Sequence, residues 1–269
     1  MSERGWEQRA AMQPVFMVAG EASGARQLAD ILNGNGLACL GAAFDVDTPY
    51  DYAFGRFLRS ANVGAAELIA APDEVLDEYL SYCAGLVRAE RFCLELGHHC
   101  MHLFNGGTWM YGQRPHLIDY LRQRRYRVVH FIRRRLFEHA VRLQMAGDGD
   151  EPPATAPESR AVVGPFTLDI ARCERDMRRL ARLSTSMTAW FKGHDGYHDL
   201  ALEAVFEAGM VSDSGAGLLE GIFDRPIASR VPSLRLEHHD IGRLVANAGE
   251  VMAAFADGPQ AGEVRDLLG

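Results

Sequence analysis

Lysine is almost absent from this chain of 269 residues, because Lys192 is the only one. The phosphate loop of nucleotide kinases has the pattern G-x-x-x-x-G-K-[ST], in which the lysine side chain reaches the phosphates. The glycine-containing turn near the N-terminus, Gly20–Gly24, holds no lysine. The sequence therefore argues against a kinase of this type.

Long apolar runs, an export signal and paired cysteines are also lacking. No apolar run approaches the ~20 residues that cross a bilayer as a helix. The first 14 residues, MSERGWEQRAAMQP, carry charges but neither an apolar segment nor a cleavage signal. The five cysteines are scattered without C-x-x-C spacing, which indicates reduced thiols instead of a disulfide framework. We therefore expect a cytoplasmic protein with no membrane span.

An excess of positive charge is missing as well. The net charge of −8 argues against a general nucleic-acid-binding protein, which needs basic side chains to neutralise phosphates. Nevertheless, nine arginines lie between Arg114 and Arg142, with few acids among them. Such a segment could bind a small polyanion locally, although a solvated basic helix and loop has the same composition.

The strands that the sequence predicts are short and apolar. Val15–Ala19 suits a buried parallel strand, and the small-residue turn Gly20–Gly24 and a helix over Ala25–Leu32 follow it. Arg127–Ile132 and Leu202–Phe206 are two further strand candidates. Alternation of strands with helices predicts an α/β fold, a doubly wound and mostly parallel sheet flanked by helices.

The remaining elements follow from helical periodicity and from breaker residues. Helices are predicted over Pro72–Leu96, Pro115–Arg125, Arg133–Met145, Phe166–Trp190, Ser214–Phe223 and Asp240–Phe255. His98–Phe104 is predicted to be extended, and the Gly-, Pro- and acid-rich segment 146–165 to be a linker or a mobile lid. A single domain over residues 1–269 is consistent with the length.

Two places in this pattern suit a phosphate. The turn before the first helix presents backbone N–H groups at a helix N-terminus, with Arg26 as an available cation, although an ordinary βα turn looks the same. Arg133 follows the strand Arg127–Ile132 at the end where ligands of open α/β sheets bind, and its guanidinium can hold a phosphate by a fork of hydrogen bonds. Arg142 lies on the helix face that points back toward Arg133.

These segments, in the order in which they occur, resemble the bacterial type of PAPS-dependent sulfotransferases. Val128–Ala146 is similar to the segment that holds the 3′-phosphate of PAPS, and Ala22–Leu28 is similar to the loop "RSGSTLL" that holds the 5′-phosphosulfate. Cys100–Leu103 resembles the strand end "KTHL". Weaker similarities follow at Leu202–Glu207, Leu219–Phe223, Leu244–Asn247 and Glu250–Val251, so the resemblance spans roughly residues 15 to 255.

The resemblance implies a P-loop sulfotransferase-like fold and transfer of a sulfuryl group from PAPS to a hydroxyl of a small molecule or glycan, with no metal required. It assigns the nucleotide to Ala22, Ser23, Gly24, Ala25, Arg26, Gln27, Arg133 and Arg142. His102 matches the general base, and Arg26 would steady the leaving phosphate. Asp45 and Asp47 are the next candidates for the base, near the position where some bacterial members carry a glutamate base. Acceptor contacts are expected from residues 44–57 and from the lid.

The chain departs from the family pattern at five positions. Ala22 replaces the leading arginine of the loop, Ala25 and Arg26 replace its two hydroxyl residues, and Cys100 replaces the lysine of the strand end. Arg142 replaces a serine but could still hold a phosphate. These departures leave open a sulfotransferase-like protein that binds a nucleotide or a partner without turnover.

Two further interpretations rest on short segments. Val18–Gly24 also resembles the opening of lipid A disaccharide synthase, a nucleotide-sugar glycosyltransferase, but that similarity covers seven residues only. His98, His99, Cys100 and His102 form a cluster that could hold zinc. In an extended segment His98, Cys100 and His102 would share one face, although no fourth ligand has the spacing of a structural site. A buried structural histidine explains His102 equally well.

Overall fold

A parallel five-stranded sheet forms the centre of the molecule. The computed structural model describes residues 14–45, 49–88, 91–105, 113–146, 165–207, 209–228 and 241–269. The strands are β1 (Val15–Ala19), β2 (Ala38–Leu40), β3 (Phe92–Gly97), β4 (Arg127–Ile132) and β5 (Tyr197–Ala201). They lie in the order β2-β3-β1-β4-β5, and each neighbouring pair is parallel. The predicted α/β fold with a parallel sheet is therefore confirmed.

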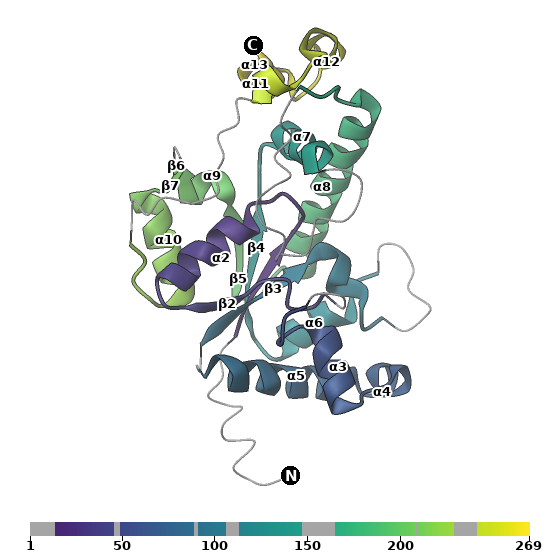
Figure 1. The fold of residues 1–269 in the computed structure, drawn as a ribbon, viewed down its shortest axis with the longest axis vertical. Helices are drawn as coiled ribbons and strands as arrows, with labels where there is room; N and C mark the ends of the chain where they lie inside the picture. Colours follow the sequence, from purple (N-terminus) through teal and green to yellow (C-terminus); the bar gives the residue numbers. More distant parts are fainter. Residues whose placement is uncertain are drawn as a thin grey trace.

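Helices cover both faces of the sheet. Side chains alternate along a strand, so each strand contributes apolar side chains to both faces. Phe16 and Val18 of β1 belong to the core on one face, whereas Val15, Met17 and Ala19 belong to the core on the other. The first core is covered by α3 (Phe54–Ala61), α5 (Pro72–Val87) and α6 (His116–Gln123), and the second by α2 (Ala25–Gly34) and α10 (Asp213–Phe223) (Figure 1).

A third core cluster lies at one end of the sheet. It is formed by α7 (Leu136–Ala146), α8 (Ile170–Trp190), α11 (Ile241–Leu244), α12 (Ala248–Ala254) and α13 (Ala261–Leu268), at the top of Figure 1. The smaller elements are α4 (Ala65–Ala70), the 3₁₀ turn η1 (His98–His102), α9 (Leu202–Val205) and the hairpin β6 (Phe206–Glu207) and β7 (Met210–Val211). Among the described helices, none has the length and apolar character of a membrane span.

The prediction of one helix over Pro72–Leu96 is wrong in its last third. Helix α5 ends because Arg88 adopts a left-handed conformation, with φ at 50°, and donates its N–H to the carbonyl of Ala84. Residues 92–97 instead form β3, which pairs with β1. A short apolar run such as Phe92–Leu96 suits a buried strand or a buried helix, so periodicity alone could not distinguish them.

Two predicted extended segments are also wrong. His98–Phe104 does not continue the strand, because β3 ends at Gly97 and η1 begins directly after it. The strand predicted at Leu202–Phe206 lies earlier, since β5 ends at Ala201, opposite the last residue of β4, and a helical turn follows.

Several boundaries shift for identifiable reasons. The helix predicted from Phe166 begins at Ile170, where the Asp169 side chain accepts the N–H of Arg172. The helix predicted over Asp240–Phe255 is two helices, α11 and α12, because the chain between them exchanges backbone hydrogen bonds with Phe166. Elements β2, α3, α4 and α13 were not predicted. Residues 147–164 of the predicted lid lie outside the described residues.

Candidate functional site

A cavity of about 480 Å³ opens at the carboxyl edge of the sheet. Its walls come from the loop after β1, the first turns of α2, the segments after β2 and β3, and arginines that follow β4. The volume is that of a small-molecule site. After β1 the chain continues to β2, which lies to one side of β1 in the strand order, whereas β4 lies on the other side of β1. The cavity therefore occupies the point of strand-order reversal at which open α/β sheets bind ligands.

The loop after β1 exposes the N-terminus of α2 to this cavity. Gly24 precedes the helix with φ at 94° and, being a glycine, contributes no capping side chain of its own. The N–H groups of a first helical turn have no partner within the helix, and the helix dipole makes them attractive to anions. Beside them, the buried Oγ of Ser23, a residue 1% exposed, has no hydrogen-bond partner among the described residues. Both features are typical of a site that is completed by an anion.

His139 of α7 holds this loop in place. Its Nε2 donates a hydrogen bond of 2.7 Å to the carbonyl of Glu21. Burial lowers the pKa of His139 to about 4, so the imidazole is neutral near pH 7. The loop conformation therefore depends on a side chain of the helix that follows β4, at the same edge of the sheet.

Two arginines after β4 share one carboxylate. Arg133, 5% exposed, donates from Nη1 to Oε1 of Glu138 at 2.6 Å, and Nε of Arg142 donates to the same oxygen at 2.9 Å. Two positive charges thus face one negative charge, and this part of the cavity wall is positive. The Nε of Arg133 is buried without a hydrogen-bond partner among the described residues, which is costly for a charged group. An anionic ligand would satisfy it.

The turn that carries Arg133 is itself anchored. The carboxylate of Glu203, at the start of α9, accepts the backbone N–H groups of Arg134 and Arg135, both at 3.1 Å. Because α9 follows β5 directly, the neighbouring strand fixes the point at which the chain leaves β4. The position of the guanidinium is therefore set by the sheet.

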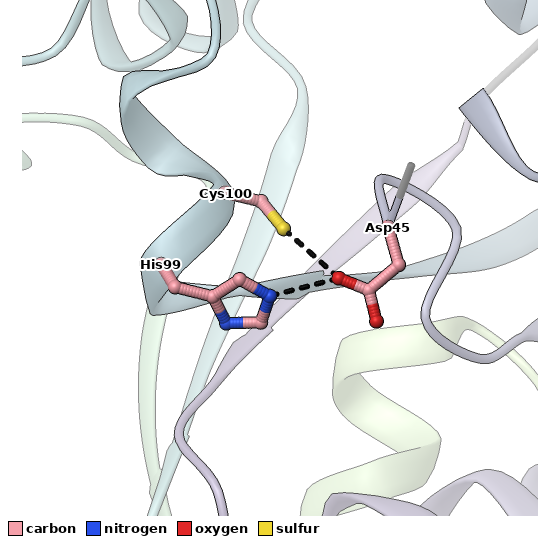
Figure 2. A group of neighbouring side chains, drawn as sticks. All are labelled: Asp45, His99 and Cys100. Atoms are coloured by element: carbon pink, nitrogen blue, oxygen red, sulfur yellow. Dashed lines mark hydrogen bonds and ion pairs between the residues drawn. The ribbon is translucent and has the colours of Figure 1, made fainter. Parts of the chain in front are cut away.

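On the opposite side of β1, Asp45 meets two residues of η1. Figure 2 shows His99 and Cys100 pointing at one carboxylate oxygen of Asp45. The Nε2 of His99 lies 2.8 Å from Oδ1, and the thiol of Cys100 donates to the same oxygen at 3.4 Å. The hydrogen bond between Asp45 and His99 lowers the pKa of the carboxyl and raises the pKa of the imidazole. All three residues line the cavity.

Glycine and tyrosine make this arrangement possible. A Cβ at Gly97 would lie 2.5 Å from Cε1 of His99, so only glycine leaves room for the imidazole. The hydroxyl of Tyr79 lies within hydrogen-bond distance of the carbonyls of Ala43 (2.6 Å) and Tyr52 (2.8 Å). This buried tyrosine of α5 therefore holds the two segments that flank Asp45.

His98 belongs to a separate buried chain of polar groups. Its Nε2 lies 3.2 Å from Nε2 of His130, and Nδ1 of His130 lies 3.1 Å from the hydroxyl of Tyr197. Burial, together with the neighbouring His130, lowers the pKa of His98 to about 3, so this imidazole is neutral near pH 7. The first ring of the predicted zinc triad thus points away from Asp45.

The structure brings most of the predicted site residues together. Ala22, Ser23, Gly24, Ala25, Arg26, Gln27, Asp45, Arg133 and Arg142 all line the cavity. His102 is not among the lining residues. It lies at the end of η1, and its Nδ1 is 3.1 Å from the side-chain amide nitrogen of Asn105. Of the candidates for a base, Asp45 lines the cavity and His102 does not, whereas Asp47 lies outside the described residues.

From the sequence, His99 was named only as a member of the histidine–cysteine cluster and was left out of the ligand triad, and Glu138 was not singled out. His99 would have been found if Phe92–Gly97 had been assigned as a strand, because polar residues directly after a parallel strand lie at the ligand-binding edge. Glu138 lies five residues after Arg133, on the first turn of α7, where it meets both arginines. Glu138 is an acidic residue in an arginine-rich segment, and this was the signal in the sequence that could have identified it.

Comparison with protein-family models, curated proteins and solved structures gives no match for this chain. Three features of the cavity matter: the open N-terminus of α2, the positive wall at Arg133, and the acid–imidazole pair of Asp45 and His99.

Proposed function

We propose that this chain is a sulfotransferase, which binds PAPS in the cavity and transfers its sulfuryl group to a hydroxyl of a small molecule or glycan. One observation carries the proposal: strand order arranges three chemically different groups along a single cavity. Asp45 and His99 lie beyond β2 and β3, the open end of α2 lies beyond β1, and Arg133 lies beyond β4.

The order of these groups suits the two ends of PAPS. The 5′-phosphosulfate and the 3′-phosphate are anions at different places on one nucleotide. The N-terminus of α2 and the Arg133 wall are anion sites beyond adjacent strands, whose axes are ~4.8 Å apart. A nucleotide bound across both would present its sulfuryl group on the side of β1 that faces β3, where the Asp45–His99 pair lies.

The chemistry requires a proton acceptor and a stabilised leaving group. The acceptor oxygen attacks the sulfur, its proton moves to the carboxylate of Asp45, and the bond from sulfur to the 5′-phosphate oxygen breaks with its electron pair on the phosphate. Arg26 and the N–H groups of α2 stabilise the charge that develops there. His99 orients the carboxylate. In-line transfer of this kind depends mainly on positioning and charge stabilisation.

Calorimetric titration with PAP, the desulfated cofactor, tests the nucleotide site. We expect micromolar binding by the wild type and a loss of about 10- to 100-fold in Arg133→Ala, the equivalent of a hydrogen bond to a charged group. Arg134→Ala is the matched control, because Arg134 follows the same strand but does not line the cavity. Ser23→Ala, a smaller change, should weaken binding by several-fold. Absence of binding at millimolar PAP would refute the proposal.

A second candidate is a binding protein without turnover. It is favoured by Ala22 and Ala25, which occupy loop positions where the resemblance has an arginine and a hydroxyl. Incubation with labelled PAPS and a panel of hydroxyl acceptors separates the two functions. Sulfuryl transfer that is lost in Asp45→Asn, with PAP binding retained, supports the enzyme. PAP binding without transfer to any acceptor supports the second candidate.

A further inference from the structure

We propose that Asp45, His99 and Cys100, the side chains drawn in Figure 2, form a binding site for one Zn²⁺ ion at the edge of the cavity. Their ligand atoms all lie within 4.8 Å of one another. Carboxylate oxygen, imidazole nitrogen and thiolate sulfur are the three kinds of protein ligand that zinc uses. The combination of a thiolate with an imidazole selects zinc over magnesium or calcium, which prefer oxygen alone.

The distances are close to those of a tetrahedral site. Typical bond lengths around zinc place an oxygen and a nitrogen ligand ~3.4 Å apart, and an oxygen and a sulfur ligand ~3.6 Å apart. The corresponding distances here are 2.8 Å and 3.4 Å. The imidazole of His99 is 61% exposed, so it can withdraw by the fraction of an ångström that zinc requires.

The fold converges the ligands independently of any ion. Strands β2 and β3 are adjacent and parallel, so the segments that follow them leave the sheet at one edge. Asp45 comes from the first segment, and His99 and Cys100 come from the second. One side of the cluster is buried at Cys100, which is 4% exposed, and the other side faces the cavity. A bound ion would therefore keep an open fourth position toward the cavity. Three protein ligands with one open position are the pattern of non-structural zinc sites.

Binding involves loss of protons but no redox step. The thiol of Cys100 must give up its proton to bind zinc, and His99 must bind through Nε2 in its neutral form. The carboxylate of Asp45 then takes part in coordination. If Asp45 is the proton acceptor proposed above, zinc lowers its basicity and inhibits transfer; that consequence rests on the proposed function, whereas zinc binding itself does not.

Direct metal titration tests the site. The full chain is freed of metal with a chelator, and zinc is then added in competition with a chromophoric chelator. We expect one equivalent to bind, with affinity reduced at least about 10-fold in Cys100→Ser and in His99→Gln. Co²⁺ in place of zinc should give the near-ultraviolet absorption of a thiolate ligand, which Cys100→Ser abolishes.

Two variants are matched controls. Cys39→Ser removes a thiol that lines the same cavity but lies outside the cluster, and His102→Gln removes an imidazole from the same 3₁₀ turn. Both should bind zinc like the wild type, and circular dichroism reports whether each variant is folded. Since His99 is exposed, His99→Gln is informative even where the change at Cys100 prevents folding.

Three results would overturn the zinc site: no binding at saturating zinc, unchanged binding in both cluster variants, or loss of binding in a control. The PAP titration is an independent measurement. Zinc binding without PAP binding refutes only the proposed function, and PAP binding without zinc binding refutes only this inference.

Discussion

Replacement of Gly24 by alanine should destabilise the protein through two separate effects. The residue has φ at 94°, a conformation that costs an L-amino acid ~1–2 kcal/mol. A Cβ would also lie 2.1 Å from Cδ1 of Leu202, which is 5% exposed and can move little. Overpacking of this kind costs ~1–3 kcal/mol. We therefore expect Gly24→Ala to lower the free energy of unfolding by about 2–5 kcal/mol, measured by urea denaturation.

A double-mutant cycle separates the two effects. In the background of Leu202→Ala the clash is gone, so adding Gly24→Ala should cost only the ~1–2 kcal/mol of backbone strain. Gly85→Ala is the control of opposite sign. A Cβ at Gly85, in the interior of α5, meets no described atom within 4 Å, and alanine should raise stability by ~0.5–1 kcal/mol. The reasoning fails if Gly24→Ala costs less than about 0.5 kcal/mol, or costs the same in both backgrounds.

Two further predictions concern the residues that hold the cavity. Burial lowers the pKa of His139 from 6.5 to about 4, so the unfolded chain binds a proton between those values that the folded chain does not. The free energy of unfolding should therefore fall as the pH drops from 6.5 to 4, by on the order of 3 kcal/mol, and the fall should be smaller in His139→Gln. If the free energy of unfolding, measured with urea at each pH, falls equally in both proteins, this prediction is contradicted. Tyr79→Phe leaves two carbonyls without their hydroxyl partner and should lower the free energy of unfolding by about 1–3 kcal/mol. Tyr82→Phe removes an exposed hydrogen bond to the carbonyl of Asp51 and should lower it by less than about 1 kcal/mol. Similar unfolding midpoints for the two variants would count against the role of Tyr79.

Local patterns predicted those parts of the site that are contiguous in the chain. The apolar run Val15–Ala19, the small-residue turn and the helix that follows it are adjacent residues whose conformations depend on one another. Strand Arg127–Ile132 was predicted with its observed bounds, and Arg133 therefore at its end. Both phosphate-binding candidates line the cavity because the carboxyl ends of parallel strands meet at one edge of a sheet.

The choice between His102 and Asp45 needed more than a local pattern. His102 was favoured because it matches the general base of the sulfotransferase resemblance. The segment that carries it was predicted to be extended, but it turns into a 3₁₀ helix that directs His99 and Cys100 toward Asp45. Asp45 is 54 positions from His99 and 55 positions from Cys100 in the chain, and sequence patterns do not reveal contacts at such separations.

The sequence by itself determined the class of fold and two of the segments that line the cavity, those after β1 and β4, because strand, turn and helix propensities act over a few neighbouring residues. Only the tertiary structure decided which side chains share the cavity. The order β2-β3-β1-β4-β5 places Asp45 beside His99 and places Arg133 on the far side of β1. Strand order is set by the packing of helices on both faces of the whole sheet, so it follows from contacts between distant parts of the chain.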